Sequence, residues 1–369
     1  MHPINRLISH SVQGMTKYHI ASLACASALA GAALATTPAC ATAHAQTTHE
    51  VQPGQSIQKA VDAAQPGDTI LLKSGIYREN VTVSTPKLTL RGTGQGTVIQ
   101  PPAKKAASMC AEQGDGICVM GAKTRNVEGV TIADLTVTGF TRAGVFGMGT
   151  DGMTVNRVHA VKNGTWGIAQ QQSVRGVFRE NYAMDNGDAG LFLANTVTAE
   201  EGAQDTKGAR VERNWLQNNR IGLTVRRLRN LTVANNDVTG NCVGMFVVGD
   251  ENKPRAGALT VQGNRVTQNN KSCPKTERLP ALQGSGIVLT GAEDSLVTRN
   301  QVTDHSGKSP LSGGIVLFKS FVGVTSERNR IHDNMLANNA PADLVNTDPG
   351  KGNTFSGNAC RVSQPSGMC

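Results

Sequence analysis

The architecture of this chain is set by a repeat, and residues Gly222–Gly244 contain one full unit, GLTVRRLRNLTVANNDVTGNCVG. A glycine opens a short apolar strand, a polar turn follows, and a second strand, LTV, leads to Asn236. A third short strand and a second turn asparagine, Asn241, complete the unit before Gly244 starts the next. Three short strands in roughly 22 residues are the pattern of a parallel β-helix, in which each coil contacts only its neighbours.

The unit recurs through most of the chain. A turn asparagine or aspartate shortly before an aliphatic residue marks each coil, at Asp134, Asn156, Asn181, Asn214, Asn236, Asn264, Asn300 and Asn329. A second turn asparagine follows at Asn186, Asn219, Asn241, Asn269 and Asn334. Asparagine tolerates the left-handed backbone angles of sharp bends, and amides stacked about 4.8 Å apart can form hydrogen-bonded ladders. We therefore assign these asparagines to the scaffold.

Composition agrees with an all-β fold. The 369 residues include 41 glycines and only 4% aromatic residues, which is too little bulk for a compact helical core. Glycine and β-branched residues dominate the repeats, and no helical period of 3.6 residues runs through them. A propeller blade would need a longer, four-stranded repeat. We expect a single-stranded parallel β-helix of about ten coils.

The first 45 residues predict export. Arg6 and Lys17 precede the apolar stretch 20–35 and the triplet Ala43-His44-Ala45, which is the pattern of a secretory signal peptide rather than of a membrane anchor.

Residues 46–369, which follow the signal peptide, carry 34 basic and 27 acidic residues, spread along the chain. That distribution argues against a nucleic-acid partner and favours an anionic polymer such as a uronate polysaccharide. We expect a secreted or extracytoplasmic protein without a membrane span after signal removal, and the oligomeric state stays open.

The cysteines also fit export. Removal of Cys25 and Cys40 with the signal leaves six, which allow 15 connectivities. Only near neighbours can meet in a linear stack, so we predict the disulfides Cys110–Cys118, Cys242–Cys273 and Cys360–Cys369. There is no CxxC pair, so we assign no zinc site.

The two ends differ from the repeat. Residues 55–64 place Ile57, Ala60, Val61 and Ala64 on one face of a short amphipathic helix, which would cover the open end of the first coil. The last segment is polar. We divide the chain into a signal peptide (1–45), an N-terminal cap with the first coils (46–105), the repeat coils (106–345) and a C-terminal cap (346–369).

The N-terminal cap carries a resemblance to a known family. VQPGQSIQKAVDAAQPGDTI at 51–70, followed by GIYRENV at 75–81, resembles the start of secreted right-handed parallel β-helix proteins of the pectin-lyase-like superfamily. With the repeats, the resemblance covers roughly residues 50–358 and implies a right-handed helix. It implies no single activity, because the superfamily contains lyases, epimerases, hydrolases, esterases, phage tailspikes and a nitrous-oxide-reductase maturation protein.

The catalytic signatures of these enzymes are incomplete here. Gly75–Glu79 and Gln204-Asp205-Thr206 are similar to parts of pectin methylesterase blocks, but the later blocks are missing. Asn346-Thr347-Asp348 matches a first polygalacturonase block, without the paired aspartates and Gly-His-Gly that should follow. The alginate-epimerase motif Asp-Pro-His-Asp is absent, and no His/Met/Cys cluster suits copper.

Isolated polar residues offer two further candidate sites, a general acid or base at His305 and a calcium site at Asp185 and Asp188. His305, beside Asp304, is a candidate general acid or base, but it stands where neighbouring coils carry the second asparagine, and we favour that scaffold role. His159 and His332 are isolated turn residues. Asp185 and Asp188 offer two carboxylates where calcium needs six to eight oxygens. We assign no metal, and calcium is the only cofactor left open.

An apolar stripe is expected on one outer face. If Ile287, Leu289, Ile315 and Leu317 point inward, alternation sends Phe146, Phe192, Phe246, Val288, Val316 and Phe318 outward. The stripe is either a sugar platform or a surface that a loop, the terminal segment or a partner covers, and we favour a cover. Partial burial of Phe192 and Phe246 would indicate the cover.

Charged residues follow each glycine-opened strand and should stack from coil to coil. The column reads Asp151, Gln171-Gln172, Glu200-Glu201, Arg226-Arg227, Asp250-Glu251, Glu293-Asp294 and Lys319. From it we take Glu201, Arg226, Arg227 and Asp250 as candidate sugar-binding residues, with Arg226 and Arg227 as weak candidates for the base of a lyase. Nearby carboxylates would hold an arginine proton more firmly, and a solvated charge ladder is the alternative.

The sequence thus predicts a secreted or cell-envelope protein that binds an acidic polysaccharide, with processing of that polymer left open. Two alternatives remain: an active polysaccharide lyase or epimerase, and a structural or adhesive surface protein without enzyme activity.

Overall fold

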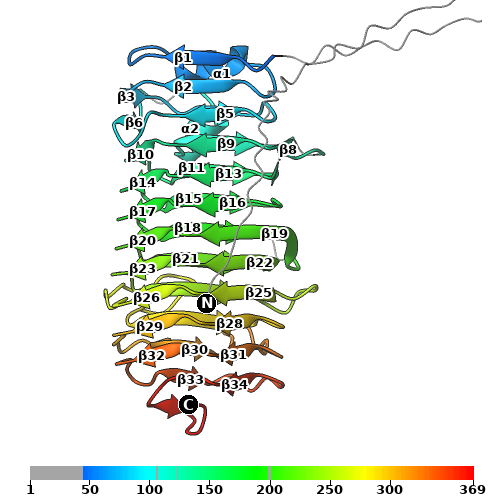
Figure 1. Ribbon diagram of the computed structural model, residues 1–369, viewed down its shortest axis with the longest axis vertical. Coiled ribbons are helices and arrows are strands. Elements are labelled where there is room, and N and C mark those ends of the chain that lie inside the picture. The colour runs from blue at the N-terminus through cyan, green and yellow to red at the C-terminus, as the bar shows by residue number, and fades with distance from the viewer. Residues whose placement is uncertain (1–44, 105–106, 123, 198–200) are drawn as a thin grey trace, which may run out of the picture. The chain divides into compact units, whose positions relative to one another are not determined.

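The chain folds as a stack of short parallel strands, three to a coil, as the repeat predicts. Figure 1 shows a computed structural model that describes residues 45–104, 107–122, 124–197 and 201–369. The expected signal peptide lies outside the described residues, apart from Ala45. The described chain from Ala45 to Cys369 forms one compact unit.

Three long sheets run along the stack, here called the first, second and third sheet, and their strands are counted over the described residues. The first sheet has 12 strands, in the order β1 (Thr48–Val51), β2 (Thr69–Leu72), β5 (Thr89–Arg91), β9 (Thr131–Ala133), β13 (Thr154–Asn156), β16 (Val177–Arg179), β19 (Gln204–Glu212), β22 (Leu228–Ala234), β25 (Gly257–Gln262), β28 (Leu296–Thr298), β31 (Arg330–His332) and β34 (Thr354–Ser356). The second sheet has 10 strands, in the order β3 (Gly75–Arg78), β6 (Thr97–Gln100), β10 (Thr136–Thr138), β14 (His159–Val161), β17 (Tyr182–Met184), β20 (Trp215–Gln217), β23 (Asp237–Thr239), β26 (Arg265–Thr267), β29 (Gln301–Thr303) and β32 (Met335–Ala337).

The third sheet has 11 strands among the described residues, in the order β35 (Ser363–Gln364), β33 (Leu344–Asn346), β30 (Gly313–Leu317), β27 (Ser285–Thr290), β24 (Val243–Val248), β21 (Ile221–Arg226), β18 (Ala189–Ala194), β15 (Trp166–Gln171), β11 (Ala143–Met148), β7 (Ile117–Met120) and β4 (Val81–Val83). A small pair, β8 (Val127–Glu128) with β12 (Thr150–Asp151), lies beside them. The strand counts agree with the expected number of about ten coils.

The core is a column of aliphatic side chains inside the coils. Neighbouring strands pair in register, so that Ile168, Leu191, Leu223 and Met245 occupy one position in successive coils of the third sheet. All four are fully buried and belong to one continuous core cluster. Burial of apolar side chains in this column is the main force that holds the coils together.

Near the N-terminal end, helix α1 (Ile57–Ala63) packs on β1, β2 and β4. Ile57 and Val61 insert into the core cluster, as the helical face predicts. Glu79, which follows β3, accepts hydrogen bonds from the Ile57 backbone N–H and the Ser56 hydroxyl, both at 2.7 Å. The Tyr77 hydroxyl donates to the Val51 carbonyl oxygen at 2.8 Å. The segment Gly75–Glu79 therefore builds the first coil.

The C-terminal segment continues the stack. Strand β34 pairs with β31, and β35 pairs with β33. Phe355 and Met368 pack against the core cluster. Asp348, from the Asn346–Asp348 tripeptide, accepts a backbone hydrogen bond from Ser326 at 2.9 Å. The tripeptide that is similar to polygalacturonases has a structural role in the last coils.

Two asparagine ladders fasten the coils at their corners. In the first ladder, each side-chain Nδ2 donates to the Oδ1 of the next asparagine at 2.9 Å. Its members are Asn181, Asn214, Asn236, Asn264, Asn300, Asn334 and Asn358. The assignments of Asp134, Asn156 and Asn329 to this column were wrong. Asp134 aligns with Glu180, one residue before the ladder position, and has a φ of 56°. Asn156 aligns with Arg179, two residues before Asn181, and Asn329 bonds to Asn353 in a separate short ladder.

The second ladder includes a histidine. Its members are Asn163, Asn186, Asn219, Asn241, Asn269, His305, Asn339 and Asp343. His305 contacts the Asn269 amide nitrogen through Nε2 at 3.0 Å and the Asn339 Oδ1 through Nδ1 at 2.9 Å. The structure therefore gives His305 the scaffold role, and Asn334, expected in this column, belongs to the first ladder.

The left-handed bend lies one residue before each asparagine of the two ladders and before His305. Glu180, Arg213 and Asn235 have φ values of 57°, 52° and 56°, whereas the asparagines that follow them do not have positive φ. The expectation that the ladder asparagines themselves occupy left-handed positions was therefore wrong. Their amides are needed for the ladder, and the backbone strain falls on a neighbour of any chemical type.

All three expected disulfides are present. Cys110 pairs with Cys118, Cys242 with Cys273, and Cys360 with Cys369. The first joins helix α2 (Met109–Gln113) to β7. The second ties a loop to the start of β24, and the third closes the C-terminal segment.

Candidate functional site

The expected apolar stripe lies on the outer face of the third sheet. Phe146, Phe192 and Phe246 occupy one column of positions but are only 2%, 7% and 3% exposed. Val288 and Val316 continue the column and are fully buried. The outer face is therefore covered, as we expected, and forms apolar layers outside the coils.

Over Phe246 the cover is an inserted loop of the chain itself, whereas Phe146 and Phe192 pack in a separate cluster with Trp166 and their strand neighbours. Residues 273–282 form a hairpin in which Cys273 and Leu282 exchange backbone hydrogen bonds at 2.9 and 3.0 Å. Cys273, Leu282 and the half-buried Leu279 pack against Phe246 in one apolar cluster. The hairpin is fixed by the Cys242–Cys273 disulfide and by Arg220, which donates to the Pro274 carbonyl oxygen at 2.7 Å.

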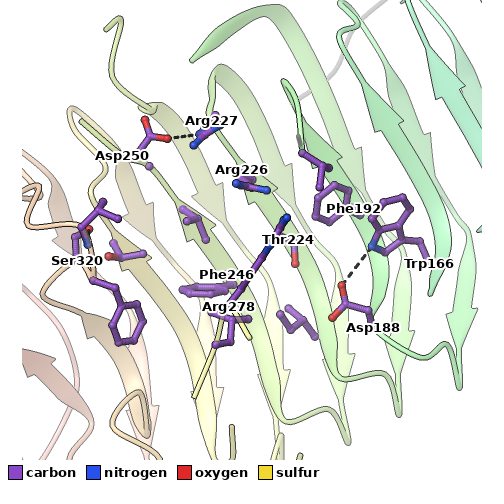
Figure 2. A pocket seen from close by; sticks show the side chains of 18 residues that line it. Trp166, Asp188, Phe192, Thr224, Arg226, Arg227, Phe246, Asp250, Arg278 and Ser320 are labelled. Atoms are coloured by element: carbon purple, nitrogen blue, oxygen red, sulfur yellow. Dashed lines mark hydrogen bonds and ion pairs between the residues drawn. The ribbon is translucent and has the colours of Figure 1, made fainter. Parts of the chain in front are cut away.

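Between these covers remains a cleft of about 400 Å³ (Figure 2). Its floor is the outer face of β15, β18, β21, β24 and β27, and its rim includes the hairpin and residues 320–322. The lining is mostly apolar, with polar groups at defined points: Asp188, Thr224, Arg226, Arg227, Asp250, Arg278, Thr290 and Ser320. A largely apolar cleft with a few convergent polar groups is the usual form of a ligand site.

Three of the four predicted sugar-binding residues meet in this cleft. Arg226 ends β21, and Arg227 forms an ion pair with Asp250 from the next coil. The side chains of Arg227 and Asp250 are only 7% and 12% exposed. Because the pair is buried, removal of either partner would leave an uncompensated charge. Arg227 and Asp250 therefore form part of the wall, and Arg226 presents its charge at the half-buried end of β21.

The opposite end of the cleft carries a carboxyl group. Trp166 Nε1 donates to Asp188 Oδ2 at 3.3 Å, and the Trp166 ring stacks on Phe192 with centroids 4.5 Å apart. Burial beside these rings raises the pKa of Asp188 above its ordinary value, opposed by the Trp166 hydrogen bond and the Arg220 charge. Asp185 is exposed, and the buried ladder residue Asn186 lies between it and Asp188 in the chain.

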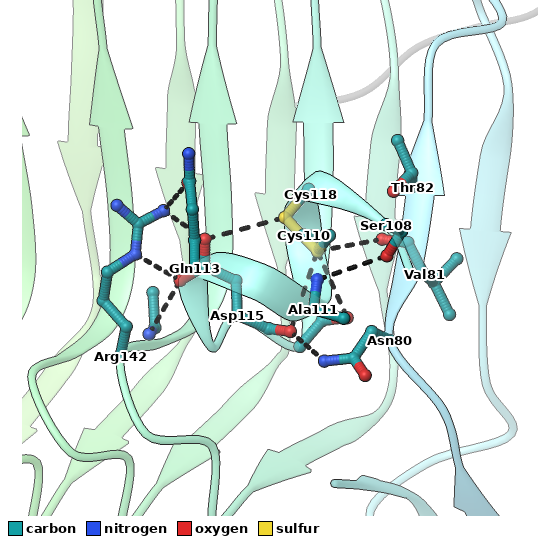
Figure 3. The surroundings of a disulfide bond; sticks show 12 residues. Asn80, Val81, Thr82, Ser108, Cys110, Ala111, Gln113, Asp115, Cys118 and Arg142 are labelled. Atoms are coloured by element: carbon teal, nitrogen blue, oxygen red, sulfur yellow. Dashed lines mark hydrogen bonds and ion pairs between the residues drawn. A yellow bond between two sulfur atoms is a disulfide. The ribbon is translucent and has the colours of Figure 1, made fainter. Parts of the chain in front are cut away.

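The wall formed by Trp166, Phe192 and Phe146 is supported from the previous coils. Arg142 Nε donates to the fully buried carboxylate of Asp115 at 2.8 Å (Figure 3). The Arg142 guanidinium lies 4.3 Å from the Phe146 ring centroid and 5.8 Å from that of Trp166. Asp115 also lies beside the Cys110–Cys118 disulfide, since Cys118 Sγ is 3.7 Å from its Oδ2. The disulfide, Asp115 and Arg142 thus hold one end of the wall in place.

The remaining members of the predicted charge column lie elsewhere. Glu201 contacts the Asn195 amide at 3.4 Å and does not line the cleft, and Glu200 lies outside the described residues. Asp151 pairs with Arg175, and Glu293 and Asp294 pair with Arg328. Gln171 does share the position of Arg226 two coils away, as the column predicts. Inserted loops of different length displace the other members, so Glu201 is not part of the cleft lining.

Several cleft residues were not predicted. Trp166, Thr224 and Thr290 lie on strands, and their outward position could have been found by aligning the glycine-opened strands residue by residue. Arg278 and Phe321 come from loops that have no repeat. No sequence signal indicates that these loops fold back over the third sheet.

Neither membrane spans nor metal clusters are found in the described part of the chain. None of its helices is long and apolar enough to cross a bilayer. No group of three or more His, Cys, Asp or Glu side chains in residues 45–104, 107–122, 124–197 and 201–369 is placed to hold a metal ion.

Two family models match parts of the chain. A right-handed β-helix region matches residues 105–256, and the periplasmic copper-binding protein NosD matches residues 194–361. The described residues do not fit a copper site. Every cysteine from Cys110 onward is in a disulfide, and His305 uses both ring nitrogens in the ladder. We therefore derive no chemistry from copper.

Solved structures of sugar-acting proteins share the fold. The A-module of mannuronan C-5 epimerase AlgE6 from Azotobacter vinelandii is 19% identical, with 82% of this chain and 88% of that chain covered and a TM-score of 0.60. DFA-IIIase from Arthrobacter chlorophenolicus A6, without its lid and in complex with GF2, is 13% identical, with 86% and 90% covered and a TM-score of 0.60. The periplasmic alginate epimerase AlgG is 13% identical, with 84% and 83% covered and a TM-score of 0.53.

No curated protein sequence matches the chain. The fold assignment rests on the parallel three-sheet stack, the asparagine ladders and these structural likenesses together. The chain is a right-handed parallel β-helix protein, which is the fold that its resemblance to the pectin-lyase-like superfamily implies.

Proposed function

We propose that this chain is an exported protein that binds an acidic polysaccharide in the cleft on the outer face of the third sheet. The observation that carries the proposal is the composition of the cleft: aromatic and aliphatic walls suited to sugar rings, with Arg226 and Arg278 reaching it from a strand and from a loop. Arginine binds carboxylates in a planar, charge-assisted geometry. An apolar cleft with arginines at its rim therefore suits a sugar that carries a carboxylate.

Two further observations support this proposal. Similar structures include a mannuronan epimerase and an alginate epimerase, whose named substrates are uronate polymers. Three disulfides and the periplasmic description of one matching family agree with a location outside the cytoplasm.

The test is calorimetric titration of the purified chain with uronate oligosaccharides, with neutral glucose oligomers as the ligand control. We expect binding of the uronates alone, weakening as salt is added because exposed charges are screened. Arg226→Gln should weaken binding roughly 10- to 100-fold, the value of a charge-assisted hydrogen bond. Arg179→Gln, an exposed arginine on the first sheet, is the matched control and should bind as the unmodified chain does.

Two results would contradict the proposal: no binding of any uronate oligomer, or equal losses for the two arginine variants. The same samples are followed by ultraviolet absorbance. Release of unsaturated uronate would instead support the alternative of a polysaccharide lyase.

A further inference from the structure

The aromatic column on the outer face of the third sheet has a notch at Thr224. In-register pairing places Phe146, Ala169, Phe192, Thr224 and Phe246 at one position in five successive coils. The two small residues, Ala169 and Thr224, alternate with the three phenylalanines. Each leaves room between two aromatic side chains that lie two coils apart, roughly 9.6 Å from strand to strand.

The protein itself fills the first gap. Trp166 lies on the same strand as Ala169, and its ring stacks on Phe192 with an interplanar angle of 11°. The guanidinium of Arg142 also lies over the Trp166 ring, 5.8 Å from its centroid. A ring therefore fits beside a small residue of this column.

Among the described residues, no tryptophan ring fills the corresponding space beside Thr224, between Phe192 and Phe246. The position equivalent to Trp166 is Ala189 in the next coil and Ile221 in the coil of Thr224. Ile221 is shorter than tryptophan and packs into the apolar cluster beneath the hairpin. The space beside Thr224 belongs to the cleft, which Phe192, Phe246 and Ile221 line with it.

The polar groups at this notch are arranged for a ligand. Thr224 is only 6% exposed, yet its hydroxyl oxygen has no hydrogen-bond partner. Thr290, 3% exposed and two coils further along, is also unpartnered and also lines the cleft. A buried hydroxyl without a partner costs free energy, which a bound hydroxyl or ring oxygen can recover.

Arg226 provides the charge beside the notch. It is two residues beyond Thr224 on β21, so its side chain leaves the same face of the strand about 6.7 Å away. We propose that the notch is a subsite for a single carboxylated pyranose ring, which takes the position at Thr224 that Trp166 takes at Ala169. Phe192 and Phe246 flank the ring, Thr224 bonds to a ring substituent, and the carboxylate pairs with Arg226. The proposal rests on the proposed function.

Thr224→Phe is the decisive variant, because it fills the notch with a ring and completes the aromatic column. Thr224→Val is its matched control, since it removes the hydroxyl but keeps the space. The probe is a uronate trisaccharide, titrated by calorimetry and by the emission of Trp166 in a Trp215→Phe background, which leaves one of the two tryptophans. We expect Thr224→Phe to weaken binding at least 100-fold with an unchanged or higher melting temperature. Thr224→Val should weaken it roughly 3- to 10-fold, the value of a neutral hydrogen bond.

The outcomes separate this subsite from the function on which it rests. If Thr224→Phe binds the trisaccharide as the unmodified chain does while Arg226→Gln loses binding, the notch is overturned and the function stands. If the unmodified chain binds no uronate, both are overturned. If Thr224→Phe fails to fold, Thr224→Leu replaces it, and normal binding by that folded variant overturns the subsite.

Discussion

At the scale of single residues, His305 is the exception in an otherwise amide-based ladder. Its ring bridges the Asn269 and Asn339 side chains in the interior, with both nitrogens engaged. The network is satisfied when Nδ1 carries the proton and donates to Asn339 Oδ1, while Nε2 accepts from the Asn269 amide. A second proton on Nε2 would face the amide hydrogens and break that contact.

Acid should therefore destabilise the coils around His305. Burial lowers its pKa from 6.5 to about 4, although the Asn339 hydrogen bond and the Asp304 charge act in the opposite direction. The folded state thus favours the neutral ring. The neutral ring gives its full contribution to the free energy of unfolding above pH 6.5. As the pH falls through 6.5 toward 4, this free energy decreases by about 3 kcal/mol. Denaturant unfolding monitored at pH 7 and at pH 4 measures this loss.

His305→Asn restores an amide at that position and is the informative variant. It should remove the His305 share of the acid sensitivity, so that the free energy of unfolding falls less between pH 7 and pH 4. His332→Asn, at a half-buried histidine beside Asp333, serves as the control. An unchanged pH dependence in His305→Asn would show that the acid sensitivity arises elsewhere.

At the scale of elements, the first coil depends on a contact between helix α1 and the end of β3. Glu79 accepts from Ser56 Oγ and from the backbone N–H groups of Ile57 and Gln58. These are the amide groups that the first turn of a helix leaves without intrahelical partners. A carboxylate at this end is also favoured by the helix dipole.

Glu79→Ala should therefore loosen the N-terminal coil. We expect a loss of about 1–2 kcal/mol in the free energy of unfolding, the range found for removal of helix caps. Chemical denaturation of the two proteins side by side gives the difference. Glu50→Ala, which removes an exposed partner of Lys73 in the same region, should cost much less. A Glu79 variant as stable as the Glu50 variant would exclude the capping role.

Helix α1 and the asparagine ladders show which features could be predicted from the sequence and which could not. Helix α1 and its buried face follow from the spacing of apolar residues, but its contact with Glu79 joins residues 22 positions apart and has no local signal. The ladder register was missed at Asn329 because Asn329 and Asn334 are equivalent by local pattern. Only the hydrogen bonds to Asn353 and Asn358 in the next coil distinguish them.

At the scale of the whole molecule, a regular stack carries irregular loops, and the two differ in how predictable they are. The coils repeat, so the parallel fold, the inward residues and the outward position of the apolar stripe could be predicted from spacing alone. The cleft could not, since it depends on where Arg278 and Phe321 lie after their loops turn back. Each coil is stabilised mainly by its neighbours, so a loop can change without unfolding the stack.

The 273–282 hairpin gives a direct test of this separation. Cys242→Ser combined with Cys273→Ser removes its covalent link to the stack and leaves the Arg220–Pro274 hydrogen bond and the apolar contacts of Leu279 and Leu282. Opening of the hairpin should expose it to proteases and move Arg278 away from the cleft. We expect faster cleavage within 273–282 and roughly tenfold weaker binding of uronate oligomers, since one arginine is worth about that factor.

The matched control is the pair Cys360→Ser and Cys369→Ser, which opens a disulfide far along the chain from the cleft. That variant should keep full binding and lose stability only in the last coils, because contacts in a linear stack do not extend beyond neighbouring coils. Limited proteolysis with mass mapping locates the first cut in each variant. If the Cys242/Cys273 variant is instead cut throughout the stack, the hairpin is an integral part of the fold. The cleft would then be a property of the coils rather than of the loops that cover them.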